Sequence, residues 1–147
     1  MNRASRRRAL KRGVKSMQSE AQGVFKYVIL TPEIVLDMSV AALAGDRTAM
    51  AYRQAIESFL DCICTVRPTR QCLLCDGEFS SAALPGAFVA LSAHREEAPQ
   101  HIVMSALCDG CAAGADLNGR IMRKYRESMC PDLRVLYSVH PVHPVLQ

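Results

Sequence analysis

The chain has 147 residues, half of them hydrophobic, so it has enough apolar material for one domain with a core and is not a disordered polypeptide. No apolar run reaches the roughly 18 residues of a membrane-spanning helix, and the basic N-terminus lacks the apolar segment of a secretory signal. These features predict a cytoplasmic protein, in which paired cysteines indicate metal or redox sites rather than structural disulfides.

The formal net charge of +4 is concentrated in the first 20 residues. They carry seven basic residues against Glu20, a charge of +6, whereas the rest of the chain sums to −2. This composition predicts a disordered tail that either binds DNA or RNA phosphates, docks on a partner or an anionic surface as an amphipathic helix, or only solubilises the protein. The candidate nucleic-acid contacts are Arg3, Arg6, Arg7, Arg8, Lys11, Arg12 and Lys15.

A strand and two helices are predicted after the tail. The β-branched and aromatic run 24–30 is typical of a strand. Thr31 and Pro32 have the chemistry of an N-cap and a first helical residue, and Gly45 with Asp46 predicts a tight turn into a second helix. We expect the second helix to pack in the core through one apolar stripe. The stripe contains Ala49, Met50, Tyr52, Ile56, Phe59, Leu60 and Ile63.

The second half of the chain has the order cysteine pair, two strands, cysteine pair, helix, strand. The runs 87–93 and 101–107 have the composition of strands and predict a hairpin. A helix is predicted after the second cysteine pair, weakened at Gly114 and Gly119, and a last strand is predicted at 133–139.

Both cysteine pairs have the Cys-x-x-Cys spacing, which presents two thiolates to one metal ion. Adjacent strands lie about 4.8 Å apart, so the intervening hairpin returns the chain to the first pair. Four thiolates satisfy the tetrahedral preference of zinc and leave no open position for a catalytic water. The pattern therefore predicts a structural rather than a catalytic zinc site.

The order of cysteine turn, hairpin and cysteine pair opening a helix resembles the treble-clef zinc finger, and the zinc ribbon is a close relative. The resemblance covers about residues 70–128 and names an architecture that serves many functions. It implies one Zn²⁺ per chain, with Cys72 and Cys75 as ligands from the knuckle and Cys108 and Cys111 as ligands from the helix start.

Two other interpretations of the cysteines stay open at this stage. The run of a strand, Cys108-x-x-Cys111 and a helix also occurs in thiol–disulfide oxidoreductases, although that reading leaves the first pair unexplained. Alternatively, all seven cysteines are small buried hydrophobic residues. His94 or His101, at the ends of the hairpin loop, is able to replace one thiolate as a ligand.

Together these patterns predict an α+β fold: a short strand and helical hairpin, then a treble-clef-like zinc module and a C-terminal strand. The expected segments are a basic tail (1–20), the strand and helical hairpin (21–66), the zinc module (67–139) and an extended C-terminal tail (140–147). No phosphate-binding loop or hydrolase motif is present, so we expect no enzymatic activity. The predicted function is binding of DNA or RNA through the tail; the alternative is a protein–protein adaptor, with the basic helix after the second cysteine pair able to serve either role.

Overall fold

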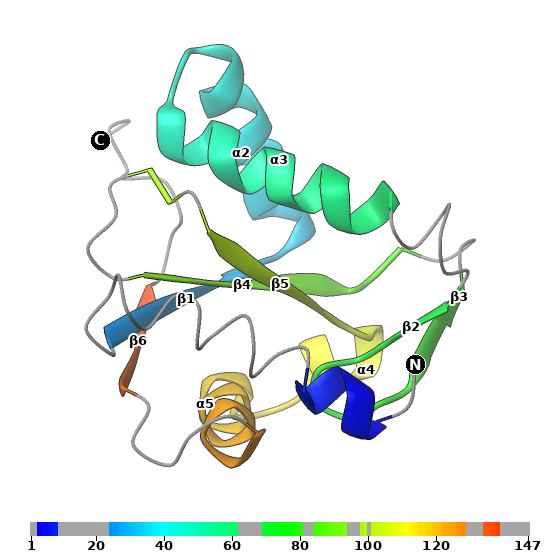
Figure 1. Ribbon diagram of the computed structural model, residues 1–147. Coiled ribbons are helices and arrows are strands. Elements are labelled where there is room, and N and C mark those ends of the chain that lie inside the picture. The colour runs from blue at the N-terminus through cyan, green and yellow to red at the C-terminus, as the bar shows by residue number, and fades with distance from the viewer. Residues whose placement is uncertain are drawn as a thin grey trace.

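The computed structural model has a mixed α and β architecture built on a four-stranded sheet with the order β5-β4-β1-β6 (Figure 1). β1 pairs antiparallel with β4, β4 pairs antiparallel with β5, and β6 joins the other edge of β1 in parallel. The strands are β1 (Val24–Leu30), β4 (Ala87–Ala93), β5 (Ile102–Leu107) and β6 (Arg134–Ser138). The structure describes residues 3–8, 24–61, 69–80, 84–93, 98–99, 101–128 and 134–138.

A helical hairpin of α2 (Pro32–Leu43) and α3 (Arg47–Asp61) covers one face of the sheet (Figure 1). The hydroxyl of Thr31 accepts a hydrogen bond from the Ile34 N–H, so Thr31 is the predicted N-cap of α2. Gly45 has a φ of 94° in the turn between the helices, a conformation that glycine adopts without steric cost. The helical hairpin is confirmed.

The apolar stripe of α3 faces the sheet, with one correction. Ala49, Tyr52 and Ile56 are buried, and the ring of Phe59 meets the ring of Phe88 edge-on with centroids 5.9 Å apart. Met50 is 51% exposed, so its predicted place in the stripe is wrong. At about 100° per residue, Met50 lies roughly 120° from the centre of the buried face. Ile63, also assigned to the stripe, lies outside the described residues.

The opposite face of the sheet is covered by α5 (Leu117–Ser128). The rings of Tyr27 on β1 and Tyr125 on α5 lie 6.0 Å apart, and the Tyr27 hydroxyl donates to Asn118 Oδ1 at 2.6 Å. With helices on both faces, all seven residues of β4 are buried. This explains why β4 has a nearly continuous apolar sequence instead of an alternating one.

The helix predicted after the second cysteine pair is divided into two. A single turn, α4 (Asp109–Ala112), is followed by residues 113–116 and then by α5. Asp116 has a φ of 52°, which is incompatible with a continuous right-handed helix. The break reorients the chain, so that α4 belongs to the cysteine cluster while α5 packs on β1.

Two short strands were not predicted, and a short helix occupies part of the tail that was predicted to be disordered. The strands β2 (Thr69–Gln71) and β3 (Glu78–Ser80) form a small separate hairpin, and residues 3–8 form a short helix beside it (Figure 1). Three-residue strands carry too little periodicity to be recognised in a sequence. Within the described parts of the chain, no helix has the length and apolar character needed to cross a membrane.

The buried face of α3 gives a test of the helix phase. Ile56→Asp places an unpaired carboxylate at a position that is only 6% exposed, so we expect a loss of stability above about 4 kcal/mol. Arg53→Asp, on the exposed face, breaks a surface ion pair with Glu57 and places two like charges together, which costs about 1 kcal/mol or less. Urea unfolding of both variants measures the difference, and equal losses would contradict the assigned phase.

Candidate metal centre

The first cysteine pair lies in the turn between β2 and β3. The Cys72 N–H donates to the carbonyl of Gly77 at 2.7 Å, and the Asp76 N–H donates back to the carbonyl of Cys72 at 3.1 Å. Asp76 has a φ of 63°, a left-handed conformation that aspartate tolerates better than most residues. The Gly77 N–H donates to Cys75 Sγ at 3.4 Å. The Asp-Gly sequence therefore closes a tight turn that holds both thiols.

The second cysteine pair lies where β5 ends and α4 begins. Cys108 is the N-cap of α4, and its Sγ accepts a hydrogen bond from the Cys111 N–H at 3.4 Å. The start of β4 lies directly against this turn, because a Cβ added to Gly86 would lie 2.8 Å from the Cα of Asp109. Only glycine fits this approach, which fixes the position of α4 relative to the sheet.

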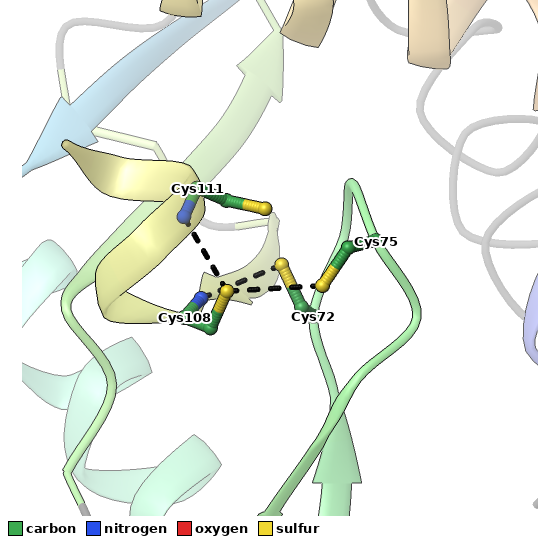
Figure 2. A group of neighbouring side chains, drawn as sticks. All are labelled: Cys72, Cys75, Cys108 and Cys111. Carbon is green, nitrogen blue, oxygen red and sulfur yellow. Dashed lines mark hydrogen bonds between the residues drawn. The ribbon is translucent and has the colours of Figure 1, made fainter. Parts of the chain in front are cut away.

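Backbone hydrogen bonds bring the two pairs together. The Leu73 N–H donates to the carbonyl of Ala106 at 2.8 Å, which attaches the first turn to the end of β5. The Cys108 N–H donates to Cys72 Sγ at 3.4 Å. As Figure 2 shows, the sulfur atoms of Cys72, Cys75, Cys108 and Cys111 converge between the two turns. All four lie within 4.8 Å of one another.

The spacing of the sulfur atoms fits a structural zinc ion. A tetrahedral site with zinc–sulfur distances of about 2.3 Å has sulfur atoms about 3.8 Å apart. The Sγ atoms of Cys75 and Cys108 are separated by 3.7 Å, close to this value. All four cysteines are free thiols. The structure thus brings together the four cysteines that the sequence indicated, in an arrangement suited to holding a metal ion.

The thiols of the cluster differ in acidity. Burial raises the pKa of Cys72, but hydrogen bonds from the backbone N–H groups of Cys75, Cys108 and Leu74 outweigh it and lower this pKa to about 7. Burial and the neighbouring thiols raise the pKa of Cys111 to about 12. Cys72 therefore ionises before Cys75 and Cys111, so binding of a metal ion by all four sulfur atoms would release protons from these two thiols.

The basic candidates of the N-terminal segment separate into three groups. Arg3 and Arg6 form ion pairs with Asp76 in the first cysteine turn. Arg7 and Arg8 are exposed on the same helix, which the structure describes at residues 3–8 where the sequence predicts a disordered tail. The others, Lys11, Arg12 and Lys15, lie outside the described residues.

Sequence reasoning missed the part that Asp76 plays beside the cysteines. Its carboxylate also lies 3.9 Å from Nζ of Lys124 on α5. The available signal was an acidic residue directly after a cysteine of the pair, in a chain whose N-terminus is strongly basic. His101 precedes β5 while Cys108 follows it, so about 20 Å of strand separates them and His101 is not a ligand of this cluster. His94, Cys62, Cys64 and Cys130 lie outside the described residues.

No protein-family model matches the chain, and comparisons with characterised proteins and with solved structures likewise give no match. The functional argument therefore depends on the geometry of the cysteine cluster and on the charges around it.

Removing one thiol should abolish metal binding. Cys75→Ser and Cys108→Ser each leave three sulfur donors, and we expect loss of the metal together with unfolding of the β2–β3 hairpin and α4, because structural metal binding supplies about 10–16 kcal/mol that is coupled to folding. Metal content and amide exchange measure the two effects. Cys130→Ser, the same substitution outside the four, is the control and should retain the metal. Full metal content in Cys75→Ser would contradict the assignment.

Proposed function

We propose that the chain is a small zinc-binding protein in which one structural Zn²⁺ supports a non-enzymatic binding module. The observation that carries this proposal is the convergence of four sulfur atoms within 4.8 Å. Thiolate ligands select soft or borderline metals such as zinc over magnesium or calcium. The proposed ligands are Cys72, Cys75, Cys108 and Cys111.

The order of elements around the cluster supports a treble-clef type of zinc module. The first pair lies in the β2–β3 turn, the β4–β5 hairpin follows, and Cys108 caps a helical turn. In this arrangement the zinc would join the turn between β2 and β3 to the start of α4. Its role is to hold these pieces in register, and the four thiolates would close its coordination shell to substrate.

The same geometry favours metal binding over thiol–disulfide exchange. A redox enzyme uses one Cys-x-x-Cys pair with an accessible attacking thiol. Here Cys72, whose pKa is lowered to about 7, is completely buried, and both pairs converge on one point. We therefore propose no catalytic role for these cysteines.

Binding of DNA or RNA is the proposed activity of the module. Arg7 and Arg8 are exposed on helix 3–8, and Arg123 and Arg126 are exposed on α5. These cations are available to the phosphate backbone, which binds through counterion release and without reading the base sequence. The partly buried Arg6 and the ion-paired Arg3 are less available, since Asp76 already engages both.

The metal is tested by analysis of protein purified without added zinc. We expect one zinc per chain, together with the release of protons when metal is added to the metal-free protein. Calcium and magnesium, which prefer oxygen ligands, serve as negative controls. Protein that is fully folded and contains no zinc, with no uptake on addition, would overturn the proposal.

Nucleic-acid binding is tested through its dependence on salt. Replacing both Arg7 and Arg8 with alanine should remove two phosphate contacts and reduce the log–log salt slope on duplex DNA by about 1.8. The matched control is Arg53→Ala, which removes an exposed cation from α3 and should leave the slope unchanged. An absence of binding by the unaltered chain at about 50 mM salt would refute this activity.

A protein adaptor is the second candidate, and the surface of α2 favours it. Leu36, Val40 and Leu43 are 67%, 68% and 81% exposed. Their spacing of four and three residues places them on one side of the helix. Such a continuous apolar stripe is typical of a protein-contacting surface. Binding through it would persist at high salt, whereas binding to phosphates would be lost.

A further inference from the structure

The N-terminal helix, residues 3–8, is attached to the turn that carries the first cysteine pair. Arg6 Nη1 donates a hydrogen bond to the carbonyl oxygen of Cys72 at 2.8 Å, and the Arg6 guanidinium also pairs with the carboxylate of Asp76. Arg3 Nε lies 3.2 Å from the same carboxylate. The hydrogen bond between Arg6 and Cys72 joins residues that are 66 positions apart in the sequence.

Arg6 contacts both ends of the first cysteine turn. The carbonyl of Cys72 begins the turn, and Asp76 follows Cys75 at its end. The Asp76 N–H donates to the same Cys72 carbonyl, so Arg6 adds a second donor to an acceptor that already closes the turn. Because the two thiols extend from this turn, its geometry determines the separation of their sulfur atoms.

The pairing is partly shielded from water. The Arg6 and Asp76 side chains are 20% and 21% exposed, whereas the Arg3 side chain is 60% exposed. An ion pair at this depth is screened less by salt than a surface pair. Lys124 Nζ, 3.9 Å from Asp76, is also largely buried, so the carboxylate connects helix 3–8, the turn and α5.

The charges around the cluster match a bound metal. A zinc ion with four thiolates has a net charge of −2, and Asp76 beside it adds a further negative charge. Arg6, Arg3 and Lys124 surround this negative region. These three cations therefore stabilise the turn more when the metal is bound than when the thiols are protonated and the metal is absent.

We propose that Arg6 is a positioning residue for the metal centre, and that docking of helix 3–8 and binding of the metal strengthen each other. This inference rests on the proposed zinc site. Groups that orient metal ligands from outside the coordination shell contribute 10–100-fold to metal affinity in many proteins. Coupling between two binding events is reciprocal, so the metal holds helix 3–8 in place by the same factor that the helix contributes to the metal.

The experiment compares Arg6→Gln with Arg8→Gln in the full chain. Both substitutions remove one positive charge from the same helix, but Arg8 is exposed. Zinc affinity is measured by competition with a chelator, and docking is measured by amide hydrogen exchange of residues 3–8 in the zinc-loaded protein. We expect Arg6→Gln to weaken zinc binding by about 10–100-fold and to speed exchange at 3–8, while amides of β4 remain protected. Arg8→Gln should change neither quantity.

Asp76→Asn provides a second variant that keeps the turn, because asparagine also adopts a positive φ. It should weaken zinc binding, and the double variant with Arg6→Gln should lose less affinity than the sum of the two single losses. Arg6→Lys, which retains the charge but not the forked donor geometry, should recover part of the loss.

The outcomes separate this inference from the proposed function. Wild-type protein that binds zinc with an affinity equal to that of Arg6→Gln would refute the role of Arg6 and leave the zinc site intact. Weakened binding with unchanged exchange at residues 3–8 would refute the coupling to helix docking. Protein that binds no zinc in any variant would refute both the site and the coupling.

Discussion

The hydrogen bond from the Leu73 N–H to the carbonyl of Ala106 joins the two halves of the cysteine cluster, and the arrangement of the sulfur atoms depends on it. Leu73 follows Cys72, and Ala106 lies two residues before Cys108. Attaching one backbone to the other at this point places the turn and the helix start side by side. The hydrogen bond from Cys108 N–H to Cys72 Sγ then completes the approach of the two cysteine pairs.

The sheet provides the rigid frame for this contact. β4 is buried along its whole length between α3 on one face and α5 on the other, so the β4–β5 hairpin cannot shift without exposing core residues. The Gly86 N–H donates to the carbonyl of Leu107, and the close approach of Gly86 to Asp109 extends the frame to α4. The cluster lies at the end of this hairpin. Its geometry is therefore set by core packing as well as by the local turns.

Asp76 forms ion pairs that attach the strongly basic N-terminal helix to the rest of the chain. Its carboxylate takes up Arg3 and Arg6 and lies near Lys124, which leaves Arg7 and Arg8 facing solvent. The N-terminal cations thus occupy two environments that the sequence does not distinguish. Arg3 and Arg6 contact the cysteine turn, whereas Arg7 and Arg8 are exposed. The proposed support of the metal site and the proposed phosphate contacts therefore fall to different residues of the same short helix.

The sequence by itself determined the features that depend on neighbouring residues. Thr31 and Pro32 specify the start of α2, Gly45 specifies the turn before α3, and the cysteine spacing indicates a site with four sulfur donors. Only the tertiary structure decided which strands become neighbours: β1 lies between β4 and β6, far away in the chain. It also decided that Asp76 faces Arg6, because an ion pair across 70 residues leaves no local pattern. Caps, turns and cysteine spacing depend on residues that are close together in the sequence. Strand order and ion-pair partners depend instead on how the whole core packs.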